Sequence, residues 1–199
     1  KRILSSLEKL SVDDNKKYLI FWKEFGKVLK EGIAEDFNNK DKIAKLLRFS
    51  STYTDNEEQT ISLDDYISRI VVSSKKIYYI TADNFGIVKN SPHLEIFRKK
   101  GIEVLLLSDR VDEWLMSHLT EYEGYKICSI VKGNIDIVDE KDNVKINDNN
   151  SSYKNLLEKI KTVLANEVKN VRFSERLTVS PSCIVVDEFD ITPHMERVM

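Results

Sequence analysis

Three acidic residues that follow an apolar run are the side chains best placed to do chemistry. Val104 to Leu107 has the composition of a buried strand, and Asp109 comes just after it, followed by Asp112 and Glu113. An acid at the carboxyl end of a parallel strand is where α/β proteins often hold a magnesium ion or a nucleophile. One interpretation is therefore a metal-dependent phosphoryl-transfer α/β enzyme centred on Asp109.

The same acids also suit an ordinary helix start. Asp109 is expected to cap a helix, with Asp112 and Glu113 stabilising the positive end of its dipole in the first turn. The six glycines never cluster, so no loop is suited to present adjacent amide groups to a phosphate. The three histidines are far apart in sequence and have no neighbouring ligands at zinc spacing. Helix capping is the favoured interpretation, and we expect no metal site.

The elements around these acids alternate between strand and helix. Ile77 to Ile80 is a first apolar run, and Ser91-Pro92 then gives a strong helix start signal, which Gly101 ends. Val104 to Leu107 follows, and a further helix carries Trp114. Strands joined by a helical crossover predict a parallel pair in an α/β layer.

The flanking segments extend this pattern. Residues 1 to about 50 are expected to be helical, with a helix end at Gly32, and Ser62 with Asp65 resembles a capping box. Tyr125 to Val131 is expected to form a strand at the sheet edge. Apolar residues at three-to-four spacing predict one buried stripe on the second helix. That stripe comprises Tyr18, Phe21, Trp22, Phe25, Val28 and Leu29.

A change in composition predicts a second unit. Residues 134–150 are rich in Asn and Asp and are expected to be a linker. The following residues predict a helix from Tyr153 to Leu164, short strands at Val171 to Phe173 and Cys183 to Val186, and a last helix opened by Thr192-Pro193. The chain is thus expected to be α/β in its central part and α+β overall.

Composition limits the classes of partner. The chain is 41% apolar and 32% charged with a formal net charge of -2, which is typical of a well-solvated globular protein and gives no attraction to nucleic acid. No apolar run is long enough to cross a bilayer. The two cysteines are expected to be buried, reduced thiols, and the cytosol is the natural compartment.

Two places could contact another chain. Trp114 is interpreted on spacing as a core residue, with an exposed aromatic anchor as the alternative, because Trp is enriched at binding hot spots. In the last helix, four apolar residues share a face that suits either an adaptable binding site or a core, and spacing does not separate the two. These residues are Ile191, Met195, Val198 and Met199.

Several segments, in order, resemble the ninety-kilodalton heat-shock protein chaperones, most closely their bacterial members. The resemblance covers essentially the whole chain and is strongest in the centre. It is carried by Ala44 to Phe49 with Ser51-Thr52, Ser62 to Tyr66 with Arg69, Lys76 to Ala82, Ser91 to Trp114, Glu121 to Gly124 and, more weakly, Leu177, Pro181 and Met195 to Met199.

The resemblance implies a layout and an absence of catalysis. Residues 1–58 would be a helical coil and 59–133 a small three-layer α-β-α sandwich, both in the middle domain. Residues 134–150 would be a linker and 151–199 the start of the C-terminal dimerisation domain. ATP and magnesium bind a domain outside this chain in the family. The chain itself is therefore expected to hold no cofactor, to have no enzymatic activity, and not to form the homodimer of the complete chaperone.

The resemblance also implies a role in binding unfolded or partly folded client proteins. Glu113 and Trp114 match positions assigned to client contact, as do Ile191, Met195, Val198 and Met199 on the last helix. Ile191 departs from the family, in which methionine is usual; it keeps the apolar character and loses flexibility. The client role requires Trp114 to be at least partly exposed to solvent.

Overall fold

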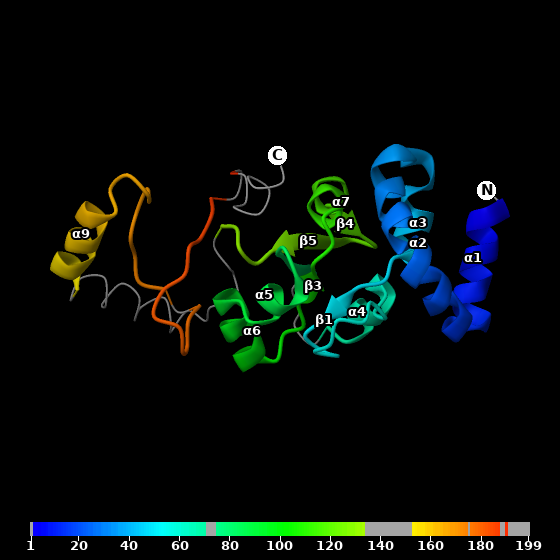
Figure 1. Cartoon of the computed structure of the whole chain (residues 1–199), viewed down its shortest axis with the longest axis horizontal. Helices are drawn as coiled ribbons and strands as arrows, with labels where there is room; N and C mark the ends of the chain where they lie inside the picture. Colours follow the sequence, from blue (N-terminus) through cyan, green and yellow to red (C-terminus); the bar gives the residue numbers. More distant parts are fainter. Residues whose placement is uncertain (1, 71–74, 134–152, 175, 188–189, 191–199) are drawn as a thin grey trace.

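The structure of the chain is a computed structural model that describes residues 2–70, 75–133, 153–174, 176–187 and 190. The described part is elongated, with a helical coil at one end, a sheet with helices on both faces in the centre, and helix α9 (Lys154–Val163) at the other end (Figure 1). None of its helices is both long enough and apolar enough to cross a membrane.

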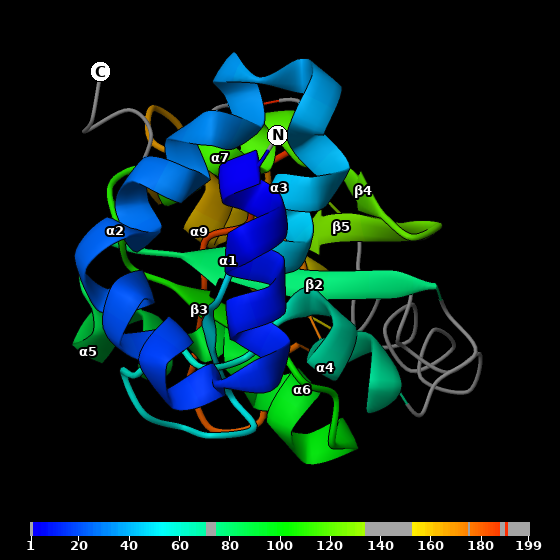
Figure 2. The ribbon, with the colours of Figure 1, turned by 90° about the vertical axis from the view of Figure 1, so that its right-hand side faces the viewer.

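The coil consists of helices joined by short turns. Its elements are α1 (Arg2–Asp13), α2 (Asn15–Glu35), the 3-10 helix η1 (Phe37–Asn39) and α3 (Lys40–Leu46). Asp14 starts α2 by accepting a hydrogen bond from the amide of Lys17, as an N-cap residue does. Figure 2, viewed along the long axis, shows α1 lying in front of α2 and α3.

The apolar stripe predicted for α2 is only partly buried. Tyr18 and Trp22 are in the core as expected, but Phe25 and Val28 are 53% and 63% exposed. The face of α2 that packs inward carries Trp22, Gly26, Lys30 and Ile33. The predicted stripe therefore included positions on the solvent-facing side of the helix. The helix end expected at Gly32 was also wrong, because α2 continues to Glu35.

Gly26 allows the indole ring of Trp22 to lie against the helix backbone. A Cβ atom at position 26 would stand 2.7 Å from Cε2 of Trp22. We expect Gly26→Ala to lower the free energy of unfolding by about 1 kcal/mol. Overpacking costs roughly 1–3 kcal/mol, and the higher helix propensity of Ala over Gly offsets about 1 kcal/mol of this cost. Urea denaturation would measure the change. Gly32→Ala is the matched control, because its Cβ would meet only Cδ1 of Ile43 at 3.4 Å; equal stability of the two variants would contradict the prediction.

The sheet has five strands in the order β1-β3-β2-β5-β4. The strands are β1 (Ser50–Ser51), β2 (Lys76–Thr81), β3 (Leu105–Leu107), β4 (Glu121–Tyr122) and β5 (Tyr125–Ser129). The predicted parallel pair is confirmed, with Tyr79 of β2 opposite Leu105 of β3. The edge position expected for Tyr125 to Val131 was wrong, because β5 lies between β2 and β4. The dipeptide strand β4 was too short to carry a sequence signal.

Helices cover both faces of this sheet and confirm the three-layer arrangement. Alternate residues of β2 point to opposite faces: Ile77 joins the core shared with the coil, and Tyr78 joins the core beneath α5 and α6. The helices are α4 (Leu63–Ser68), α5 (Phe85–Lys89), the 3-10 helix η2 (Pro92–Leu94), α6 (Glu95–Lys100) and α7 (Asp112–His118).

The local helix signals are confirmed. Ser62 and Asp65 form the expected capping box at the start of α4. Ser91 accepts a hydrogen bond from the amide of His93, with Pro92 at the first helical position, and Gly101 ends α6 with a φ of 65°. A positive φ suits glycine because it has no Cβ.

The last part of the described chain has little regular structure beyond α9. The strand expected at Val171 to Phe173 is absent, and of the strand expected at Cys183 to Val186 only a parallel bridge from Val186 to Lys132 is formed. Alternating apolar residues alone do not make a strand unless a partner backbone lies alongside. The whole of the expected linker, residues 134–150, and the whole of the expected last helix lie outside the described residues.

Candidate functional site

Asp109 is held by three side chains from two separate parts of the chain. Its carboxylate lies 2.9 Å from Nζ of Lys30 and 3.3 Å from Nζ of Lys27, both on α2. Nε2 of Gln59 donates to the same carboxylate at 2.8 Å, and Oε1 of Gln59 accepts from the indole of Trp22 at 3.1 Å. The acid at the strand end therefore links the sandwich to the coil.

Asp112 is the second partner of Lys30. Its Oδ1 lies 2.7 Å from Nζ of Lys30, and each of the two side chains is only 1% exposed. Its Oδ2 accepts a hydrogen bond from the backbone amide of Asp109. The expectation that Asp109 caps the helix was therefore wrong: α7 begins at Asp112, and it is Asp112 that orders the turn before it.

The two carboxyl groups respond oppositely to this environment. Burial would raise the pKa of Asp109, but attraction to Lys30, hydrogen bonds from Lys30 and Gln59, and attraction to Lys27 lower it to about 2. Burial raises the pKa of Asp112, and Lys30 only partly opposes the rise. A charged Lys30 is thus what makes an ionised Asp112 tolerable in the interior.

This geometry gives the phosphoryl-transfer interpretation no support. One carboxylate oxygen of Asp109 and one of Asp112 are directed at the ammonium group of Lys30. Glu113 does not join them, because it accepts a hydrogen bond from the hydroxyl of Thr81 at the end of β2. Within the described ranges, no three acidic, histidine or cysteine side chains come together as a metal site would require.

Trp114 lies on the same helix and remains partly in solvent. Its side chain is 39% exposed, whereas Leu115 and Met116 beside it are buried. Its ring packs edge-on against His118 with the ring centroids 5.1 Å apart. The interpretation of Trp114 as a core residue was therefore wrong. The exposure that a contact residue requires is present, while its role in binding stays a prediction.

The structure brings together only part of the predicted contact set. Glu113 and Trp114 are adjacent on the first turn of α7. The other members lie outside the described residues: Ile191, Met195, Val198 and Met199. Sequence reasoning missed Lys30 and Gln59. Lys30 falls at helical spacing from Trp22 and Gly26 on the buried face of α2, and a lysine at such a position could have indicated a buried ion pair. Gln59 lies in a polar loop, and its sequence context gave no such signal.

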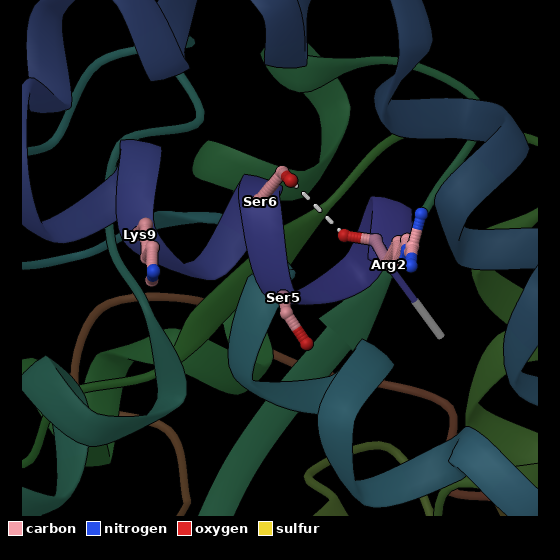
Figure 3. A pocket seen from close by; sticks show the side chains of 4 residues that line it. All are labelled: Arg2, Ser5, Ser6 and Lys9. Carbon is pink, nitrogen blue, oxygen red and sulfur yellow. Dashed lines mark hydrogen bonds between the residues drawn. The ribbon is translucent and has the colours of Figure 1, made fainter.

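A surface hollow over α1 does not offer a stronger candidate. It is lined by Arg2, Ser5, Ser6 and Lys9 (Figure 3). All four come from one helix, and the hydroxyl of Ser6 donates to the carbonyl of Arg2. Side chains from a single helix face do not converge on a common point as those of a binding site do. The region around α7 is therefore the better candidate.

The family model described as Hsp90 protein matches residues 1–199, the whole chain. The chain belongs to the Hsp90 protein family. Curated relatives include the chaperone protein HtpG of Psychromonas ingrahamii, 54% identical over 202 residues, and that of Methylococcus capsulatus, 51% identical over 202 residues. Each alignment covers 100% of this chain and 32% of the relative, so the chain spans about a third of their length.

A solved structure agrees with the fold. The middle domain of a putative heat shock protein of Plasmodium falciparum superposes with a TM-score of 0.59 at 33% sequence identity. The match covers 65% of this chain and 53% of that one. The mixed α/β architecture expected for this Hsp90-family chain is thus shared, over 65% of its length, with the middle domain of that heat shock protein.

Proposed function

We propose that the chain is part of an ATP-dependent molecular chaperone and that it supplies a surface that binds unfolded or partly folded client proteins. Its relatives are named as chaperones. The observation that carries the proposal is Trp114, a large aromatic side chain 39% exposed on a helix that is otherwise anchored in the core.

The anchoring of α7 suits such a role. Leu115 and Met116 are buried beneath Trp114, and Asp112 is tied to α2 through Lys30. A rigid helix presents its exposed aromatic ring without having to be ordered on binding, which reduces the entropic cost. The exposed 39% of a Trp of roughly 250 Å² is about 100 Å², and covering it would contribute about 2–3 kcal/mol, of which truncation to Ala would remove a part. That is suited to weak, reversible binding of many sequences.

The remaining features of the complete protein are part of the same proposal. ATP and magnesium would bind outside this chain, and the chain itself would not be an enzyme. The complete protein would be a cytoplasmic homodimer that responds to stress and binds neither nucleic acid nor membrane. Residues 1–58, 59–133, 134–150 and 151–199 would be the coil, the sandwich, the linker and the start of the dimerisation domain. Ile191, Met195, Val198 and Met199 would supply a second client contact.

Binding of a fluorescently labelled, permanently unfolded client, followed by anisotropy, tests the Trp114 contact. Trp114→Ala should weaken binding by about 1–2 kcal/mol, roughly 5- to 30-fold in Kd. Ile87→Ala is the matched control, because Ile87 is 53% exposed on α5, which covers the opposite face of the sheet. Equal Kd values for the two variants, with both still folded by circular dichroism, would refute a client site on α7.

A further inference from the structure

The carboxylate of Glu95 is the most heavily bonded group that the proposed function leaves unexplained. Glu95 is the first residue of α6, and it accepts hydrogen bonds from Thr178, Val179 and Ser180, more than eighty residues further along the chain. The amides of Val179 and Ser180 donate at 2.8 and 3.0 Å. The amide of Thr178 and the hydroxyls of Thr178 and Ser180 donate to the same two oxygens.

This arrangement is a carboxylate seated on a turn of backbone amides. Three successive N–H groups directed at one anion form a concave site that favours negative charge. The hydrogen bond from the hydroxyl of Ser180 and those from the amides of Thr178 and Val179 hold the pKa of Glu95 down at about 2. The Glu95 side chain is therefore fully charged at neutral pH and remains a strong acceptor.

Three further contacts join the same two parts of the chain. Arg176 is 5% exposed, and its guanidinium donates to the carbonyls of Ile130 and Gly133 beyond β5. Val186 and Gly133 bond through their backbones, as do Val186 and Val131. The ring of His93 is buried where η2 meets Ile184. In Figure 1 the segment that makes these contacts, residues 176–186, is the orange-to-red trace beside the α5–α6 side of the sandwich.

We propose that Glu95 is one of two docking points that fix residues 176–186 to the sandwich, and that loss of its charge loosens the segment. The contacts of Arg176 and Val186 lie at the end of β5, whereas Glu95 lies at the start of α6. Contacts at two separate points fix the orientation of the segment relative to the sandwich, whereas a single contact would allow the segment to rotate about it. Glu95 is therefore a positioning residue between the sandwich and the part of the chain that follows residue 153.

The docking bears on client binding only through the function proposed above. If clients contact both Trp114 and the part of the chain that follows residues 176–186, release of Glu95 would change which clients can reach both. The docking itself does not depend on clients, so it can be tested without them.

Amide hydrogen exchange of the whole chain, resolved by NMR, is the direct test. Glu95→Gln should accelerate exchange at Val179 and Ser180 by roughly tenfold, the effect expected of losing a hydrogen bond to a charged acceptor. The informative amides are those of Gly133 and Val186, which do not touch Glu95. Their exchange should also accelerate several-fold if the segment undocks, while the amides between β2 and β3 stay protected. Glu58→Gln, in an exposed loop, is the matched control.

Two further variants separate docking from local capping. Ser180→Asp places a second carboxylate against Glu95 and should accelerate exchange at Gly133 and Val186. Glu95→Asp keeps the negative charge that the three amides bind, so it should accelerate exchange at both amides less than Glu95→Gln does. If Glu95→Gln affects only residues 178–180, or if Glu95→Asp and Glu95→Gln accelerate exchange at Gly133 and Val186 equally, Glu95 merely caps a turn and the proposal is overturned. Because no client is present, a failed client site would leave this result unchanged.

Discussion

Lys30→Met should lower the free energy of unfolding by about 3–5 kcal/mol, the range expected when a buried ion pair loses one partner. Nζ of Lys30 is the cation that faces the buried carboxylate of Asp112, 2.7 Å away. Methionine keeps an apolar stem of similar length but removes the Nζ that lies 6.0 and 5.5 Å from the ring centroids of Trp22 and Phe49, and it leaves that carboxylate without a counter-charge. Urea denaturation at neutral pH, with circular dichroism to confirm folding, would measure the loss.

The cost of Lys30→Met should depend on pH in a defined direction. The pKa of Asp112 is already raised by burial, and removal of Lys30 raises it further. A carboxyl group whose folded-state pKa is raised costs stability that builds up as pH rises from its unfolded-state pKa and is complete above its folded-state pKa. The destabilisation should therefore shrink as the pH falls from neutral towards 3.8, the ordinary aspartate value. A cost that grew on acidification would contradict this account.

Two variants distinguish the loss of the buried ion pair from the loss of any positive charge on α2. Lys27 also pairs with Asp109, but its side chain is 74% exposed, so Lys27→Met should cost less than about 1 kcal/mol. Lys30→Met combined with Asp112→Leu removes both buried charges and should recover much of the stability lost in the single variant. If Lys30→Met cost no more than Lys27→Met, solvent would have to reach Asp112, against its 1% exposure.

Features that depend on neighbouring residues could be predicted from the sequence. The capping box of Ser62 and Asp65 and the Ser91-Pro92 start of η2 are formed within a single turn, so the pattern contains all the partners. The parallel pairing of β2 with β3 also follows, because a short helical crossover leaves few other arrangements. Fold class and family therefore needed no tertiary information.

Features that depend on distant partners could not be predicted. Asp109 was expected to cap a helix, but its partner Lys30 lies 79 residues earlier, and a buried ammonium outcompetes a local amide as a partner for the carboxylate. The exposure of Phe25, Val28 and Trp114 depends on which face of each helix meets the sandwich. Periodicity shows that a helix has an apolar face, whereas the direction of that face is set by the packing of the whole chain.

Tyr66→Phe should lower the free energy of unfolding by about 2–3 kcal/mol, because it leaves a backbone donor and a backbone acceptor unpaired at once. The hydroxyl of Tyr66, on α4, donates to the carbonyl of Glu103 at 2.5 Å and accepts from the amide of Tyr78 at 3.0 Å. Tyr66 is 2% exposed, so water is poorly placed to replace either bond. Urea denaturation of the variant and the parent chain gives the difference.

Two other tyrosines provide a graded comparison. Tyr53 is 67% exposed, and Tyr53→Phe should change stability by less than about 0.5 kcal/mol. The hydroxyl of Tyr18 is buried but bonds one carbonyl, that of Leu46, so Tyr18→Phe should cost about 1 kcal/mol. The order Tyr66, Tyr18, Tyr53 would show that Tyr66 joins α4 to both β2 and the residues before β3. A Tyr66 cost equal to that of Tyr53 would mean that the backbone groups find other partners, and α4 would then be held by its apolar contacts alone.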